Sequence, residues 1–469
     1  MTDAPGAPGA NGPTASAVPP GLPPLPHRLP PAERLARLPA GFRAGGMAAG
    51  LKRSGRPDLA IVATVDGPAS AAAVFTRNAF AAAPVRLSRA HLAATTPDGG
   101  GRWGRATAVV ATSGAANAAT GPAGAADQRE IVAACAAALG TAPELVLAMS
   151  TGVIGLRLPV DRVTAALPVL AGGGLGDSPA HLEAAARALM TTDSTPKWAT
   201  AGATVPGAAG APLAVTVSGI AKGVGMIHPG MATMLAVLLT DAPVDPRTLH
   251  GLLRSAASRT WNQLTVDGDT STNDTVVALA SGAAPALPIV AGSPAAETLG
   301  RAIEAVARDL ARQQAADGEG ATTLVSCQVS GAADDPEARA VARAVVASSL
   351  VKAAVNGRDP NWGRIAGAAG NARLPDAAVL EAAGLHASQA RSRAGAAARL
   401  DPDRLRIAIA GALVYAGGPV AFDAAATRAA MTAPEVLIRL DLGLGHGVGE
   451  AFGCDLTEEY VRENAEYTT

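Results

Sequence analysis

Apolar runs that end at turn residues predict buried strands along this 469-residue chain. DLAIVATV (58–65) and RATAVVATSG (105–114) are the first two runs of this kind. A short, nearly continuous apolar run bounded by turn residues is typical of a strand covered on both faces. The same criterion predicts strands over 211–223, 322–331, 404–417 and 436–445.

Alanine-rich segments between these runs predict helices, which cover 126–140, 293–320 and 336–355. The longest repeats apolar residues at spacings of three and four, at Leu299, Ile303, Val306 and Leu310. This spacing places them on one face of a helix. Strands and helices mix without a strict β-α-β order, so the predicted fold class is α/β (α+β) with layered sheets.

Residues 1–38 are rich in Pro, Ala and Gly and lack an amphipathic pattern, which predicts a disordered extension. No basic stretch followed by apolar residues begins the chain, so no secretory signal is expected. The uncharged window 223–240 is long enough for a bilayer, but Pro229, His228 and several glycines interrupt it. We therefore expect a cytoplasmic protein.

Composition narrows the range of functions. Hydrophobic residues make up 49% of the chain and aromatic residues 3%, so Ala, Val, Leu and Ile must form most of the core. A net charge of −1 argues against nucleic acid or an anionic membrane as the main partner. Cys135, Cys327 and Cys454 lack metal-ligand spacing and are interpreted as buried thiols of a reducing compartment.

Two segments, one rich in glycine and one rich in aspartate, resemble ligand loops but lack the required residues. LGLGHGVG (442–449) has no Lys-Ser/Thr pair for a phosphate. DGDTSTND (267–274) has Thr272 where a calcium loop needs Gly, and Ala278 where it needs Glu. Neither segment predicts a phosphate or metal site.

The segment KGVGMIHPGMATML (222–235) carries a different chemistry, because the small Ala232 precedes the hydroxyl residue Thr233. Attack of the Thr233 hydroxyl on the Ala232 carbonyl would form an ester that water cleaves. The new chain would begin at Thr233 with a free α-amine, whose ordinary pKa of about 7.7–8 suits a base near neutral pH. Threonine with its own terminal amine is a known type of nucleophile. The ordinary alternative is a buried apolar segment without catalysis.

Eight segments in order along the chain resemble the bifunctional ornithine acetyltransferase / glutamate N-acetyltransferase family of arginine biosynthesis. The resemblance covers about Gly41 to Thr469. The segments are SGRPDLA (54–60), STGVIG (150–155), MTTDSTPK (190–197), KGVGMIHPGMATML (222–235), TVDGDTSTND (265–274), DGEGAT (317–322), DPNWGR (359–364) and NAEYTT (464–469).

The resemblance implies an N-terminal-nucleophile-like acyltransferase fold, cleaved into an α chain (39–232 after the extension) and a β chain (233–469). Thr233 would be the nucleophile, and Thr151 and Gly152 would form the oxyanion hole. The matched substrate-binding positions are Thr192, Lys222, Thr233, Glu319, Asn464 and Thr469. Lys222 suits an α-carboxylate and Glu319 an α-ammonium. The alternatives are a solvated charge for Lys222 and a helix-ending cap for Glu319.

By this resemblance, acetyl passes from N2-acetyl-L-ornithine to L-glutamate through acetyl-Thr233, without metal or organic cofactor, in an α2β2 assembly. Some members of the family also accept acetyl-CoA. Three departures from the family pattern leave the donor and acceptor open: TSGAANAATG (112–121), Leu156 and Thr323. The other hypotheses are an acyltransferase of specialised metabolism, an N-terminal-nucleophile amidase or aminopeptidase, and a non-enzymatic binding protein.

Overall fold

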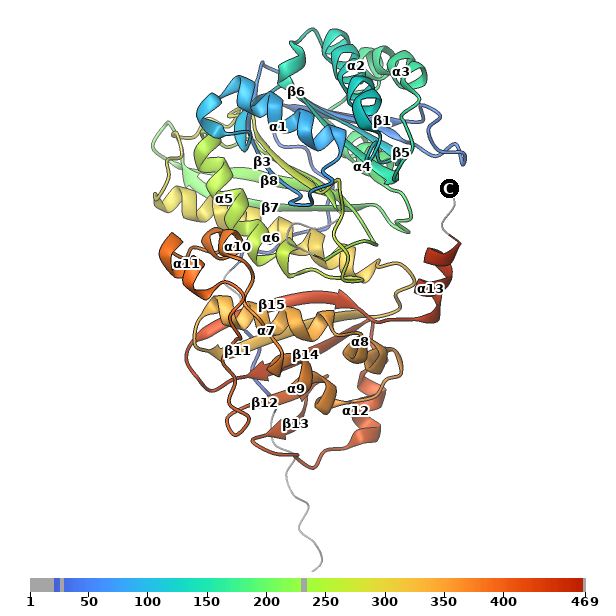
Figure 1. The fold of residues 1–469 in the computed structure, drawn as a ribbon. Coiled ribbons are helices and arrows are strands. Elements are labelled where there is room, and N and C mark those ends of the chain that lie inside the picture. The colour runs from blue at the N-terminus through green and yellow to red at the C-terminus, as the bar shows by residue number, and fades with distance from the viewer. Residues whose placement is uncertain (1–20, 26–28, 229–233, 467–469) are drawn as a thin grey trace, which may run out of the picture.

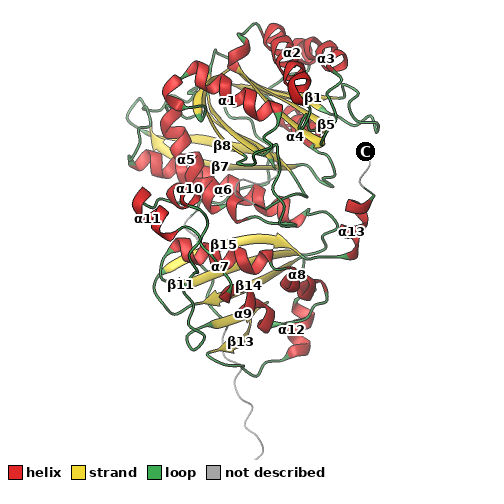
Figure 2. Ribbon diagram, in the orientation of Figure 1, coloured by secondary structure: helices red, strands yellow, loops and turns green. Residues whose placement is uncertain are grey.

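Sheets and helices alternate in layers through this chain (Figure 1, Figure 2). The computed structural model describes residues 21–25, 29–228 and 234–466. Within these ranges three sheets and the helices around them form a mixed α/β architecture, which confirms the predicted fold class. No helix of the described chain combines the length and apolar composition that a membrane crossing needs.

The first two sheets stack with helices between them. The four-stranded sheet has the order β1-β2-β5-β6, with strands Phe42–Met47 (β1), Leu59–Thr64 (β2), Ala108–Ala115 (β5) and Val146–Val153 (β6). The six-stranded sheet has the order β4-β3-β10-β9-β8-β7, with strands Trp103–Ala106 (β4), Ala69–Phe75 (β3), Thr275–Ala280 (β10), Leu235–Thr240 (β9), Pro212–Lys222 (β8) and Lys197–Pro206 (β7). Helices α1 (Ala83–Thr95) and α4 (Pro179–Leu189) contact strands of both sheets.

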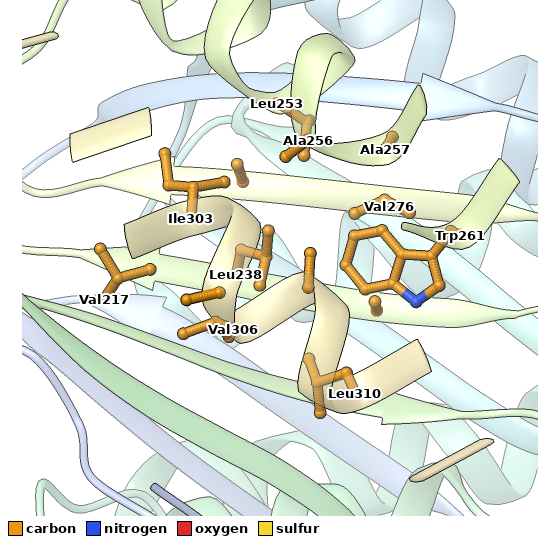
Figure 3. Close-up of a cluster of buried hydrophobic side chains, with 14 of the residues drawn as sticks. Val217, Leu238, Leu253, Ala256, Ala257, Trp261, Val276, Ile303, Val306 and Leu310 are labelled. Atoms are coloured by element: carbon orange, nitrogen blue, oxygen red, sulfur yellow. The ribbon is translucent and has the colours of Figure 1, made fainter. Parts of the chain in front are cut away.

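Further helices cover the outer faces of this stack. Helices α2 (Gly121–Leu139) and α3 (Val160–Gly173) pack on the four-stranded sheet. Helices α5 (Pro246–Arg259) and α6 (Pro294–Ala316) pack on the six-stranded sheet. Ile303, Val306 and Leu310 of α6 lie over Leu238 of β9 and Val217 of β8 (Figure 3). The apolar face predicted from spacing is therefore the buried face of this helix.

The other face of α6 packs on a third sheet, with the order β13-β12-β14-β11-β15. Arg308 and Arg312 of α6 stack over the Phe452 ring, each with its guanidinium 5.5 Å from the ring centre. They also pair with Glu450 and Glu435. The strands are Ala412–Ala416 (β13), Arg406–Ile409 (β12), Glu435–Asp441 (β14), Leu324–Ala332 (β11) and Gly447–Cys454 (β15). Helix α6 thus lies between the six-stranded sheet and the third sheet and packs on both.

The remaining helices follow β11 in the chain, and among them α7 packs on the third sheet. They are α7 (Asp335–Ala347), α8 (Ser349–Asn356), α9 (Trp362–Gly370), α10 (Ala377–Ala382), α11 (Ala387–Arg393), α12 (Ala424–Ala430) and α13 (Glu458–Ala465). The three cysteines are buried and unpaired, as predicted. Burial raises the pKa of the Cys135 thiol to about 12.

Several predicted elements are divided in the structure. The strand predicted over 105–114 becomes β4 and β5, because the chain passes from one sheet to the other at Thr107. The helix predicted over 336–355 breaks at Ser348, whose hydroxyl accepts a hydrogen bond from the Val351 N–H at the start of α8. Serine is a common residue at this position.

The strand predicted over 404–417 is a hairpin of β12 and β13. Its turn residues Ala410 and Gly411 have φ angles of 47° and 90°. Such a turn normally carries Asn-Gly, since both residues need positive φ. Alanine at the first position explains why the sequence did not indicate a turn.

The described part of the extension is packed against the fold, contrary to the prediction of disorder. Glu33 pairs with Thr200 of β7 as an isolated bridge. Ala36 and Leu22 are buried, and Arg439 donates a hydrogen bond to the Leu22 carbonyl at 2.8 Å. Scattered apolar residues among prolines and glycines anchor this segment without any periodic pattern.

We predict that Ala410→Asn stabilises the protein by about 1 kcal/mol, because asparagine tolerates the left-handed conformation better than alanine. Ala410→Val should destabilise it, since a β-branched residue is strained at positive φ. Thermal melting of the two variants tests the opposite signs. Equal shifts in the same direction would contradict the turn geometry.

Candidate active site

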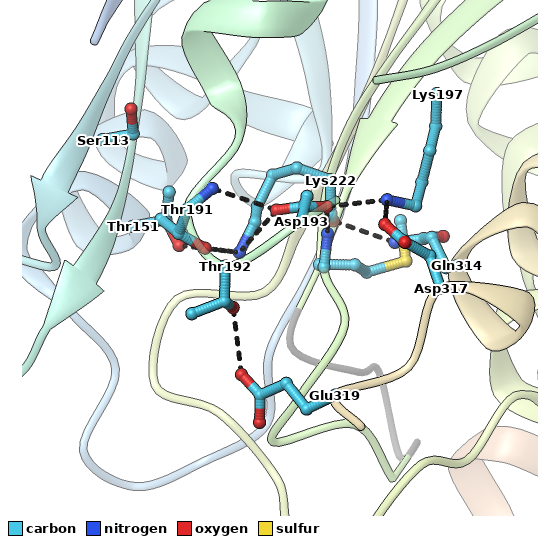
Figure 4. Close-up of polar contacts among 12 residues, drawn as sticks. Ser113, Thr151, Thr191, Thr192, Asp193, Lys197, Lys222, Gln314, Asp317 and Glu319 are labelled. Atoms are coloured by element: carbon cyan, nitrogen blue, oxygen red, sulfur yellow. Dashed lines mark hydrogen bonds and ion pairs between the residues drawn. The ribbon is translucent and has the colours of Figure 1, made fainter. Parts of the chain in front are cut away.

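Six of the residues singled out in the sequence line one cavity of about 350 Å³. They come from segments far apart in the chain: Thr151, Gly152, Thr192, Lys222, Glu319 and Asn464. A second cavity of about 580 Å³ adjoins it, because Gly152, Thr192 and Glu319 line both. Figure 4 shows Thr151, Lys222 and Glu319 converging from different elements.

Thr151 and Gly152 lie near the end of β6. Gly152 has a φ of +126°, and a Cβ there would lie 2.4 Å from the Gly114 carbonyl carbon on β5. Only glycine permits this close approach of the two strands. Thr151 and Gly152 both line the cavity wall.

Lys222 ends β8 and is only 5% exposed, which excludes the solvated-charge interpretation. Its ammonium donates hydrogen bonds to the Thr191 hydroxyl at 2.8 Å and the Thr151 hydroxyl at 3.3 Å. It lies 3.8 Å from a carboxylate oxygen of Asp193. Burial lowers the pKa of Lys222, and Asp193 opposes this shift. The result is a cation at the cavity wall with hydroxyl partners and room for an anionic oxygen.

Asp193 stands between Lys222 and a second buried lysine, Lys197. Its carboxylate accepts hydrogen bonds from Lys197 Nζ at 2.8 Å and from the Gly223 N–H at 2.9 Å. Lys197 Nζ also donates to Asp317 at 2.6 Å. Burial acts to raise the pKa of Asp193, but Lys222 and Lys197 lower it overall. Asp193 is therefore an anion held by two cations (Figure 4).

The sequence interpretation missed this network, although MTTDSTPK and DGEGAT contain its members. Thr192 was selected from the first segment, and Asp193 and Lys197 were not. Lysines at strand positions, Lys197 and Lys222, were the available signal, because a buried lysine needs an acid.

Glu319 lies beyond the end of α6 and faces the cavity. Its carboxylate accepts hydrogen bonds from the Thr192 hydroxyl at 2.9 Å and the Asn464 amide at 3.0 Å. A Cβ at Gly225 would lie 2.1 Å from the same carboxylate, so glycine makes the approach possible. Since α6 ends at Ala316, Glu319 does not cap that helix. Asn464 brings α13 to the cavity.

Ala232, Thr233 and Thr469 lie outside the described residues. The described chain on both sides of residues 229–233 is held by the TVDGDTSTND segment. Asp267 accepts a hydrogen bond from the Ile227 N–H at 2.9 Å. Asp274 accepts one from the Met234 N–H at 3.1 Å. Burial raises the pKa of Asp274 well above its ordinary value.

Gly225 and Met226 also line the cavity. The chain therefore reaches the cavity seven residues before Thr233. Among the departures from the family pattern, Leu156 lines the adjoining cavity and is 48% exposed. The Thr323 N–H instead donates to Asp455 at 3.0 Å.

Comparison with known proteins identifies relatives over most of the chain. A family model described as the ArgJ family matches residues 43–469. The "Arginine biosynthesis bifunctional protein ArgJ" of Thermus thermophilus is 45% identical over 434 residues, covering 92% of this chain and 99% of that protein. The protein of the same name from Thermosynechococcus vestitus is 44% identical over 453 residues, covering 92% and 96%.

Two solved structures are also similar to this chain in sequence. A crystal structure of the arginine biosynthesis bifunctional protein argJ of Bacillus halodurans is 38% identical, with a TM-score of 0.43. It covers 49% of this chain and 98% of that chain. The structure of ornithine acetyltransferase complexed with ornithine from Mycobacterium tuberculosis is 36% identical, with a TM-score of 0.35, covering 42% and 98%.

We predict that Asp193→Asn lowers the free energy of unfolding by about 3–5 kcal/mol, because two buried lysines lose their shared anion. Because the folded pKa of Asp193 is lowered, its charge stabilises the fold above the unfolded pKa of about 3.9 and this stabilisation is lost as the pH falls below it. Urea unfolding between neutral pH and pH 3 measures both effects.

The variant should therefore lose less stability on acidification than the unmodified protein does. Asp177→Asn, at an exposed loop aspartate, is the matched control and should change stability little. Equal destabilisation by the two substitutions would show that Asp193 does not hold the lysines.

Proposed function

Because this chain belongs to the ArgJ family, we propose how the cavity around Lys222 and Glu319 performs its chemistry. The chain is an acyltransferase of arginine biosynthesis. The proposed reaction takes acetyl from N2-acetyl-L-ornithine, stores it on Thr233 and transfers it to L-glutamate. Six predicted residues from distant segments line one cavity, and the chain shortly before Thr233 lines the same cavity. This observation carries the proposal.

The nucleophile arises by cleavage between Ala232 and Thr233, which yields chains 1–232 and 233–469. In the first half-reaction the Thr233 hydroxyl oxygen bonds to the acetyl carbonyl carbon. The α-amine of Thr233 accepts the hydroxyl proton and passes it to the departing nitrogen, so that ornithine leaves with a neutral α-amine. The Thr151 hydroxyl and Gly152 N–H stabilise the oxyanion, and losing one such donor typically costs about 3–4 kcal/mol.

In the second half-reaction the amine of glutamate attacks the acetyl carbon of acetyl-Thr233. The Thr233 oxygen leaves and recovers its proton through the α-amine, and N-acetylglutamate departs. Both substrates carry an α-carboxylate beside the reacting nitrogen. Burial lowers the pKa of Lys222, and Asp193 opposes this shift. We assign Lys222 to that carboxylate.

Glu319 requires a different assignment from the one expected from sequence. The α-nitrogen of acetylornithine is acylated, so the side-chain ammonium is the free cation of this donor. We assign Glu319, oriented by Thr192 and Asn464, to that ammonium. A carboxylate surrounded by neutral hydrogen-bond donors can accept a charge-assisted hydrogen bond from an ammonium.

Glutamate has a carboxylate where ornithine has its ammonium, so its side chain must avoid Glu319. Lys52, Arg53 and Arg56, from one loop, line the adjoining cavity and offer the complementary charge, whereas Glu319, Glu463 and Glu466 also line this cavity. Burial lowers the pKa of Lys52 to about 8, so this side chain is mostly charged at pH 7. We assign this basic wall to the γ-carboxylate of glutamate.

A cytoplasmic α2β2 assembly and acetyl-CoA as a second donor belong to the same proposal. Departures at Leu156 and in 112–121 keep a related donor and acceptor pair as the second candidate. An amidase with the same nucleophile would release acetate in place of N-acetylglutamate. The products therefore separate these functions.

Intact-mass spectrometry tests the nucleophile. We expect two fragments, and a brief exposure to acetylornithine should add one acetyl group to fragment 233–469 alone. Thr233→Ala should remain a single chain of 46.1 kDa and show no exchange. Thr233→Ser keeps a hydroxyl and should still be cleaved. An unmodified protein that stays in one piece would overturn the mechanism.

Glu319→Gln should raise KM for acetylornithine and lower kcat/KM by roughly ten- to a hundredfold, because a hydrogen bond to a charged group contributes about 1.5–3 kcal/mol. The half-reaction with glutamate, followed from pre-formed acetyl-enzyme, should change less. Glu297→Gln, at an exposed glutamate of α6, is the control. Equal loss in both half-reactions would contradict the assignment to the side-chain ammonium.

A further inference from the structure

A further cavity of about 200 Å³, apart from the two at the candidate active site, lies beside α5, α7 and α10. Figure 1 shows α10 between α5 and α7. None of the described residues that line it lines the candidate active site. The polar residues that line it are Arg339, Arg343, Arg373, His228, Gln263 and Ser258.

The positive charge in this cavity is poorly neutralised. Arg343 has a buried Nε without a hydrogen-bond partner among the described residues. The carboxylate that acts on it, Asp376, pairs with Arg77 at the surface. Arg339 lies 3.8 Å from Asp335, whose side chain is half exposed. Burial lowers the pKa of Arg343 to about 10, so the guanidinium remains charged at neutral pH.

No acidic side chain occurs among the described residues of this wall. An amino acid with a free ammonium would therefore lack a carboxylate to pair with, whereas a carboxylate would meet guanidinium groups suited to paired hydrogen bonds. Desolvation and Arg343 lower the pKa of His228 to about 4, which leaves it neutral at pH 7. The cavity thus selects anions without an ammonium.

Gln263 restricts the ligand further. Its side chain is 6% exposed, its Nε2 donates to the Ser258 carbonyl, and its Oε1 has no donor among the described residues. A ligand N–H would satisfy this oxygen, and a buried polar atom left without a partner costs about 1–3 kcal/mol. The remaining wall is apolar and includes Ala340, Ala344, Val379 and Leu380.

We propose that this cavity binds a small dicarboxylic acid whose nitrogen is acylated, with its carboxylates on Arg339 and Arg343 and its amide N–H on Gln263. The acyl group lies against the alanines of α7. N-acetyl-L-glutamate is the probe of this class, because it has two carboxylates, one amide N–H, a methyl group and no ammonium.

Calorimetric titration of the full protein with N-acetyl-L-glutamate tests the site. We expect two binding events per chain, one at each cavity. Arg343→Gln should weaken one event roughly tenfold or more, as loss of a hydrogen bond to a charged group does, and leave the other unchanged. Glu319→Gln should leave the Arg343-dependent event unchanged. Arg301→Gln, at an exposed arginine of α6, should retain both events.

L-Glutamate and succinate are the comparison ligands. L-Glutamate should show no event that depends on Arg343, and succinate, without an N–H, should bind there more weakly than N-acetyl-L-glutamate. Identical titrations of the unmodified protein and Arg343→Gln would overturn the proposal, as would equally tight Arg343-dependent binding of L-glutamate.

Arg343→Gln removes a buried charge whose carboxylate, Asp376, is already paired with Arg77, so the variant should melt no lower than the unmodified protein. Arg343→Lys retains the charge but not the planar fork, and should weaken binding by an intermediate amount. The initial rate of acetyl transfer should be unchanged in Arg343→Gln. Failure of acetyl transfer in the unmodified protein would refute the proposed function and leave this binding test intact.

Discussion

The candidate active site depends on the neutralisation of two buried lysines by Asp193. Lys197 begins β7 and Lys222 ends β8, and both side chains are buried. A buried ammonium without an anion would lose its proton or destabilise the fold. By accepting from Lys197 and from the backbone of Gly223, Asp193 fixes the loop before β7 to the end of β8. Asp317 then connects the same lysine to the end of α6. The cavity walls are positioned by charge pairing in an otherwise apolar interior.

This network lies where the sheets and α6 meet. The ends of β6 and β8 contribute Thr151, Gly152 and Lys222, while the segment after α6 contributes Glu319. Because α6 packs on two sheets at once, its end is held rigidly. Rigid supports matter here, since oxyanion donors and an acid that recognises a cation act only at fixed distances. In the cavity wall, hydroxyl groups and one amide surround isolated charged side chains. This composition suits substrates whose side chains end in different charges.

Local patterns of the sequence predicted those parts of the fold that local physics determines. The spacing of Leu299, Ile303, Val306 and Leu310 predicted the buried face of α6, and continuous apolar runs predicted β2 and β8. The passage of the chain from one sheet to the other at Thr107 left no such pattern, because long-range strand pairing decides it. The Ala410-Gly411 turn left none either, because alanine is an unusual residue at its first position. Among site residues, Lys222 and Glu319 were identified by resemblance of whole segments. Asp193 was missed because its partner Lys222 lies far along the chain at the end of β8, and no local spacing records that contact.

The strand order of the six-stranded sheet has a consequence for the cleaved form that we propose. Strands β9 and β10, which follow residue 233, lie between β3 and β8, which precede it. Each fragment would therefore hold an incomplete sheet whose missing strands belong to the other fragment. Unfolding of the mature protein is then also a dissociation, so its melting temperature depends on protein concentration and its refolding is bimolecular. The intact precursor has no such requirement, and this makes folding before cleavage the efficient order of events.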